Sequence, residues 1–140
     1  MAFAKQSSAG SSEIGLAILR IGTGATLFLR HGWEKQPIHW AQFFAHFPDP
    51  VHIGSRPSFL IAFVSDFVCS LLLVLGVATR WAALFCFCNI LVAWALVHRF
   101  AFFGRGAGEH GEVIVLYLVA LLTLVLTGSS ALSLSSLRGR

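Results

Sequence analysis

Charged side chains are scarce in this sequence: ten lysines and arginines and six aspartates and glutamates make up 11% of its 140 residues. The basic residues form no dense run, so the electrostatic signature of a nucleic-acid-binding protein is missing. Apolar residues account for 56% of the chain and the mean hydropathy is +0.79. A soluble domain of this composition could not cover its surface with polar groups, so the composition indicates a protein of the lipid bilayer.

Motifs that hold cofactors are also missing. The three cysteines, Cys69, Cys86 and Cys88, form no CxxC pair and no metal-ligand spacing, and no Rossmann fingerprint occurs at a strand-to-helix turn. We therefore expect no metal site and no covalently bound cofactor. Apolar packing is the favoured role of the three thiols, and a redox role is the alternative.

Four long apolar stretches fill most of the chain. They run approximately from Glu13 to Arg30, Ser58 to Ala78, Trp81 to Phe103 and Glu112 to Leu132. Each approaches the roughly 20 helical residues that cross a hydrocarbon core of about 30 Å. Because unpaired backbone groups are costly in lipid and the runs show no strand alternation, helices are favoured over a barrel. We predict an all-α bundle of four transmembrane helices over residues 13–134, with a flexible tail at 1–12 and a basic tail at 135–140.

The first predicted helix has a plausible start and several small residues. Ser11 and Ser12 are typical N-caps, so we expect the helix to begin there. Gly15, Gly22 and Gly24 would allow neighbouring helix backbones to approach closely. Span one is therefore predicted to be tightly packed inside the bundle.

The connection between spans one and two contains an amphipathic segment from Ile38 to Phe47. Its aromatic residues alternate with His39, Gln42 and His46, which predicts a short helix in the membrane interface. The two histidines are seven residues apart and share a face, which we expect to point toward headgroups and water. A metal or haem site is the alternative for this pair.

The turn between spans two and three sets the topology. The polar break at residues 76–80 is so short that the two spans must form an antiparallel hairpin. Four spans place both termini on one side, and the basic residues number four on that side and five on the other, so their count does not decide the orientation. We expect cytoplasmic termini and the cell inner (plasma) membrane, because the tails and the tight turn are nearly free of acidic residues.

Ionisable residues inside the spans are the candidate functional groups, because each costs about 2.5–3.5 kcal/mol at a helix centre unless it finds a partner or water. Arg20 and Asp66 are the clearest cases, and we expect them to form an ion pair between spans one and two. Purely structural locking of the two helices is one interpretation of this pair. His31 and Lys35 continue the stripe of Arg20 along the first helix.

A small polar cavity is predicted at the mouth of the bundle opposite the termini. The residues expected there are His31, Lys35, Asp66, His98, Glu109 and Glu112, with Arg20 holding Asp66 charged. Asn89 and His98 are nine residues apart and point to opposite faces of a regular helix, so we expect Asn89 to form a hydrogen bond across helices instead. The alternative is that several of these residues only mark the membrane interface.

Such a set of groups suits a quinone headgroup. Histidine exchanges protons near neutral pH, and neighbouring carboxylates can relay them. A quinone needs donors to its carbonyl oxygens, a proton route and an entrance from the lipid for its tail.

Several motifs resemble the DoxX family of small four-helix membrane proteins. Leu19-Arg20-Ile21-Gly22, followed by Phe28-Leu29-Arg30-His31-Gly32 and Lys35, is similar to the family's opening pattern. Residues 72–76 and 79–83 resemble its Leu-rich hairpin with Gly, Thr-Arg and Ala-Ala, and Asp66 stands where the family usually has glutamate. Residues 126–128 and 132–134 resemble its closing signature, although Ser129 and Ser130 replace Pro-Gly and Ser135 replaces aspartate. The resemblance covers residues 13–134.

The resemblance implies a setting for the predicted cavity. Relatives include a small subunit of thiosulfate:quinone oxidoreductase and membrane partners of redox enzymes. The leading hypothesis is an integral membrane subunit or accessory of a redox system that interacts with quinone, with the redox cofactors in a partner subunit. The alternative is a non-catalytic membrane assembly or lipid-binding protein. A solute or proton carrier ranks last, because the chain shows no inverted repeat or proline-broken helix pair.

Overall fold

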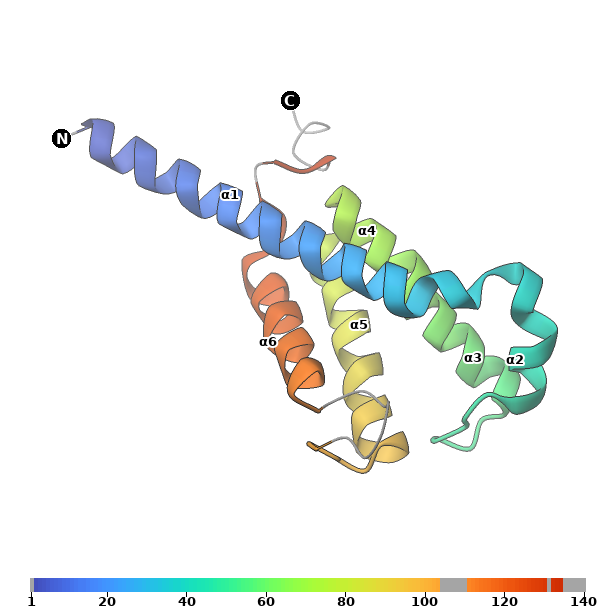
Figure 1. Cartoon of the computed structure of the whole chain (residues 1–140). Helices are drawn as coiled ribbons and strands as arrows, with labels where there is room; N and C mark the ends of the chain where they lie inside the picture. The colour runs from blue at the N-terminus through green and yellow to red at the C-terminus, as the bar shows by residue number, and fades with distance from the viewer. Residues whose placement is uncertain (1, 104–110, 131, 135–140) are drawn as a thin grey trace.

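The computed structural model of this chain describes residues 2–103, 111–130 and 132–134, and all regular elements in these ranges are helical (Figure 1). The α-helices are α1 (Ala2–Leu27), α2 (Trp40–His46), α3 (Ser55–Phe63), α4 (Ser70–Leu75), α5 (Thr79–Val92) and α6 (Gly111–Thr127). Three segments are π-helical: η1 (Phe28–Gly32), η4 (Val64–Cys69) and η5 (Ala93–Val97). Two short 3-10 turns, η2 (Trp33–Lys35) and η3 (Pro37–His39), connect η1 to α2.

Three continuous helical stretches in the described part of the chain are long and apolar enough to cross a membrane: Gly10–Lys35, Ser55–Leu75 and Thr79–Val97. The fourth, α6, has 17 residues and rises about 26 Å. The chain is therefore a multi-pass membrane protein. The predicted all-α bundle with a short helix between its first two spans is confirmed.

The predicted hairpin between spans two and three is present, with span two displaced three residues toward the N-terminus and span three shorter than expected. The second span ends at Leu75 because Gly76 and Ala78 adopt left-handed backbone, with φ of 71° and 48°. The third span ends at Val97 and not near residue 103. Just after Val97, Arg99 and Phe100 take positive φ values of 49° and 53°, which turn the chain out of the helix.

The start of the first helix differs from the prediction. Helix α1 begins at Ala2, so Ser11 and Ser12 lie inside it and the predicted cap is wrong. The predicted close packing holds for Gly24, where a Cβ would lie 2.7 Å from the Ser70 carbonyl oxygen. Gly15 and Gly22 face open space, because a Cβ added at either position would have no atom within 4 Å. The boundary and mobility of a 1–12 tail stay predictions.

The short helix α2 packs on span two with its aromatic face. The fully buried ring of Phe59 in α3 is surrounded by four rings from α2 and its C-cap: Trp40, Phe43, Phe44 and Phe47. The Phe43 and Phe59 rings stack with centroids 5.0 Å apart. The aromatic side of α2 therefore covers the start of the second span. His39, Gln42 and His46 are exposed, as the amphipathic pattern predicts.

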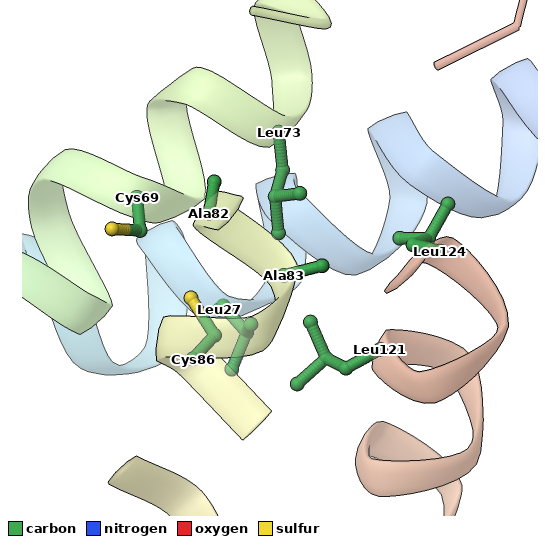
Figure 2. Close-up of a cluster of buried hydrophobic side chains, with 8 residues drawn as sticks. All are labelled: Leu27, Cys69, Leu73, Ala82, Ala83, Cys86, Leu121 and Leu124. Carbon is green, nitrogen blue, oxygen red and sulfur yellow. The ribbon is translucent and has the colours of Figure 1, made fainter. Parts of the chain in front are cut away.

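The core joins all four spans. Its buried members are Leu27, Cys69, Leu73, Ala82, Ala83, Cys86, Leu121 and Leu124 (Figure 2). Helix α1 contacts α4, and α5 packs along α6 (Figure 1). The free thiols Cys69 and Cys86 belong to this core, whereas the free thiol Cys88 is exposed. Apolar packing therefore accounts for two of the three cysteines.

Candidate functional site

A cavity of about 980 Å³ opens between the end of span one, the loop before α3, η5 and the start of α6. Most of its lining is apolar, including Leu27, Ile61, Ile90, Val97 and Ile114. The polar lining residues include Arg30, His31, Lys35, Asp66, Asn89 and His98. Its size lies at the upper end of the roughly 300–1,000 Å³ typical of small-molecule sites, which are likewise mostly apolar with a few polar groups.

An ion pair lies in the cavity wall. Lys35 Nζ is 3.1 Å from Asp66 Oδ2, and the two side chains are only 7% and 12% exposed. The same ammonium donates to the His31 carbonyl at 2.8 Å and lies 3.5 Å from Glu34 Oε1. Asn89 Nδ2 donates to the other oxygen, Asp66 Oδ1, at 3.4 Å. The expected cross-helix hydrogen bond of Asn89 is thus confirmed, and spans one, two and three meet at one carboxylate.

The predicted ion pair between Arg20 and Asp66 is wrong. Arg20 is 2% exposed, and its Nη1 donates to the carbonyls of Leu73 at 2.6 Å and Val74 at 2.8 Å. Its Nη2 donates to the Leu132 carbonyl at 2.8 Å. Both carbonyls lie at the end of α4, where the negative end of the helix dipole suits a buried guanidinium, and the Leu73 carbonyl also accepts the Gly76 amide at 3.1 Å. Arg20 therefore holds the end of span two and the segment after α6.

Backbone contact between spans one and two allows the lysine to reach the carboxylate. A Cβ on Gly32 would collide with the backbone carbonyl oxygen of Asp66, so only glycine fits at this position. The hydroxyl of Ser70 donates to the same carbonyl at 2.5 Å. The close approach of η1 and η4 at this point sets the geometry of the ion pair.

Each of the three π-helical segments places a polar residue at the cavity. His31 lies in η1, Asp66 in η4, and His98 directly after η5. A π-turn holds about one residue more than an α-turn, so it shifts the side chains beyond it by about 100° around the axis. For this reason Asn89 and His98, which a regular helix would separate, line the same cavity. π-turns are rare and recur at functional sites. None of the three contains proline, and the sequence analysis missed them.

The structure brings together four of the predicted site residues and separates two. His31, Lys35, Asp66 and His98 line one cavity. Glu112 is exposed at the start of α6 and, like Arg20, is absent from the lining. Glu109 lies outside the described residues. Arg30 and Asn89 are additional lining residues, and Asn89 was left out of the predicted cavity because a regular helix was assumed.

One carboxylate holds the loop that forms a wall of the cavity. Asp49 Oδ1 accepts hydrogen bonds from the Ser58 hydroxyl at 2.7 Å and the Ile53 amide at 3.0 Å, and Oδ2 accepts one from the Gly54 amide at 2.7 Å. The Ser58 bond, followed by the two amides and the nearby His52, holds the pKa of Asp49 below its ordinary value despite an opposing effect of desolvation. The neighbouring residues 47, 48, 50 and 51 line the cavity, so this network shapes its wall.

The described residues contain no group of three or more histidine, cysteine, aspartate or glutamate side chains placed to hold a metal ion. The alternative metal or haem site at His39 and His46 therefore finds no further ligands in that part of the chain. The cavity has hydrogen-bond donors, one carboxylate and apolar walls. Such a site can hold a mostly apolar ligand by a polar head.

The fold and the cavity together define a small polytopic membrane protein with a polar-ended cavity between its helices. The family model described as DoxX matches residues 15–99, which is more than half of the chain. The chain belongs to the DoxX family. A protein of Haemophilus influenzae (strain ATCC 51907 / DSM 11121 / KW20 / Rd), described as an uncharacterized protein, is 33% identical over 130 residues, covering 90% of this chain and 84% of that protein. No solved structure matches this chain.

Proposed function

We propose that this chain is an integral membrane subunit or accessory of a redox system and that the cavity binds a quinone headgroup. The observation that carries the proposal is the juxtaposition of Lys35, Asp66 and Asn89 at one wall of a large apolar cavity, with His31 and His98 in the same lining. A quinone has two carbonyl oxygens that accept hydrogen bonds and a long apolar tail. This cavity offers donors for the first and apolar walls for the second.

Each polar residue has a role in the proposed complex. The Asn89 amide and the Lys35 ammonium are the donors closest to Asp66, so a carbonyl oxygen of the headgroup would bind beside this pair. Reduction of a quinone to a quinol takes two electrons and two protons. His98 is exposed and His31 half-buried, so imidazoles lie between bulk water and the interior, where they can pass protons. In this proposal the electrons come from a redox partner subunit.

The proposal also includes the membrane and its orientation. We place the chain in the cell inner (plasma) membrane with cytoplasmic termini, which puts the quinone cavity near the opposite leaflet. Support comes from the acid-poor turn at residues 76–80, which lies at the other end of the bundle from the cavity.

Photoaffinity labelling tests the quinone site. The purified full chain in lipid nanodiscs is exposed to a quinone with an azido group on its ring and an isoprenoid tail, and labelled peptides are mapped by mass spectrometry. We expect labels on η1, η4 and α5 around the cavity. His31→Ala and Asn89→Leu should each lower labelling several-fold, because each removes a polar group from the lining. His46→Ala is the matched control, since this exposed histidine of α2 is not in the lining.

A cellular measurement complements the labelling. In membranes that contain the intact system, His31→Ala should lower quinone reduction while the amount of inserted protein stays unchanged. Labelling spread evenly over lipid-facing residues, or equal in wild type and in both cavity variants, would refute the quinone site.

A non-catalytic assembly or lipid-binding role is the second candidate. The observation in its favour is that Lys35 and Asp66 already neutralise each other, as a pair that only joins two helices would. Under this function, the cavity variants should leave quinone reduction unchanged. Substitutions in the ion pair should then lower folded yield without any effect on labelling.

A further inference from the structure

A second, smaller cavity lies at the opposite end of α5. Its volume is about 240 Å³, and it is lined by Ala78, Thr79, Arg80, Trp81, Gly128 and Ser129. These residues come from the end of the hairpin turn, from the first turn of α5 and from the segment directly after α6. Among the described residues, the lining contains a cation and no acidic side chain.

The exposed side chain of Arg80 lies against the segment that follows α6. A Cβ on Gly128 would lie 2.9 Å from Arg80 Nε, so the side chain rests directly on the glycine that follows α6. The α6 C-terminus, with its negative dipole end, favours a cation there. Within the described ranges, Arg80 forms no ion pair and donates no side-chain hydrogen bond. Its guanidinium therefore has donors left for an external anion.

The start of α5 adds further donors. The Ala82 amide is bonded to the Ala78 carbonyl at 3.0 Å, so the amides of the residues between them precede the helical hydrogen-bond ladder. Ala78, at the N-cap, offers no side-chain cap. Thr79 is 3% exposed, and its hydroxyl has no hydrogen-bond partner in the described part of the chain. A buried hydroxyl without a partner is costly, and a ligand oxygen would supply that partner.

The site also lies at the depth of lipid headgroups. It is built on a turn between two membrane spans, and Trp81 beside it is 75% exposed, as expected of an aromatic residue at the membrane interface. We propose that this cavity binds a phosphate group through Arg80, Thr79 and the first amides of α5. The two sources of such a group are the phosphodiester of an anionic lipid and inorganic phosphate. This inference is independent of the quinone proposal.

Lipid retention in detergent tests the site. The full chain, purified in a non-ionic detergent, is mixed with phosphatidylglycerol or with diacylglycerol, which has no phosphate, and the retained lipid is measured by native mass spectrometry. We expect retention of phosphatidylglycerol and not of diacylglycerol. Arg80→Gln should weaken that retention about tenfold, as expected for loss of a charge-assisted hydrogen bond. Arg99→Gln is the matched control, because this exposed arginine follows the other end of the same span.

Two further steps keep every result informative. Thr79→Val removes only the hydroxyl and should weaken retention several-fold, and it tests the site even if Arg80→Gln fails to fold. Inorganic phosphate is then added at constant ionic strength: displacement of the lipid identifies free phosphate as a competent ligand, whereas no displacement identifies the lipid headgroup. Equal retention of phosphatidylglycerol and diacylglycerol, or retention by both cavity variants at the wild-type level, would overturn the proposal.

Discussion

Removing the cation of the buried ion pair should be the most damaging substitution in the cavity. In the variant Lys35→Met, the Asp66 carboxyl group would lose its cationic partner in a position only 12% exposed, with the Asn89 amide at 3.4 Å as its remaining side-chain partner among the described residues. Breaking a buried pair by removing one member typically costs about 3–5 kcal/mol, because an uncompensated charge is left behind. We expect a loss of stability in this range.

The reverse substitution should be milder. In Asp66→Asn, Lys35 retains the His31 carbonyl at 2.8 Å and the Glu34 carboxylate at 3.5 Å, and the new amide can still accept a hydrogen bond. We expect a cost of about 1–3 kcal/mol. The double variant should be more stable than the sum of the single effects predicts, by about 1–3 kcal/mol, because neither charge is then left alone.

Reversible unfolding in mixed micelles measures these differences. The chain has four tryptophans, so their fluorescence can follow the transition as the fraction of denaturing detergent rises. Glu34→Gln is the control, since the Glu34 side chain is 53% exposed and its contact should contribute at most about 1 kcal/mol. Additive effects in the double variant, or wild-type stability of Lys35→Met, would refute the coupling derived from the structure.

Three further substitutions test other contacts. Gly32→Ala should destabilise the fold and weaken quinone labelling, because the added Cβ would collide with a backbone carbonyl of η4. Gly22→Ala is the control: a Cβ at this position meets no atom, so the variant should be neutral or stabilising by up to about 1 kcal/mol in the same unfolding assay. Arg20→Met should cost about 3 kcal/mol, since three backbone carbonyls each lose the charged donor that Arg20 supplies, and wild-type stability would contradict this capping role. The lowered pKa of Asp49 means that its ionised form stabilises the fold above the unfolded carboxyl's pKa of about 3.9, and this contribution is lost as the pH falls through the lower folded value. The thermal stabilities of wild type and Asp49→Asn should therefore differ near neutral pH and converge as the pH falls below the unfolded value of about 3.9. The same convergence is expected for Ser58→Ala, which removes the main bond to this carboxylate.

Local features explain why much of this protein can be predicted from its residues. The length of each apolar run shows whether it can cross the bilayer, so the runs give the number of spans. Gly76 indicates the hairpin because the backbone there is left-handed, which glycine adopts readily. The alternation of aromatic and polar residues predicts the short helix between the first two spans. Four of the seven candidate site residues also reach a common cavity, because polar residues in a membrane span gather where lipid is absent.

The pairing of charges depends instead on how the helices cross. Arg20 and Leu73 are 53 positions apart, and nothing local indicates that a guanidinium will bind the end of another helix instead of a carboxylate. Lys35 reaches Asp66 only because Gly32 lets two backbones meet, and His98 lines the same cavity as Asn89 because the π-turn η5 rotates the helix face beyond it. Each apolar segment must form a helix because its own backbone groups would otherwise be unpaired in lipid, and this cost can be read from the segment alone. Which donor pairs with which acceptor depends instead on residues from distant segments, so it is determined only by their relative positions after the helices have packed.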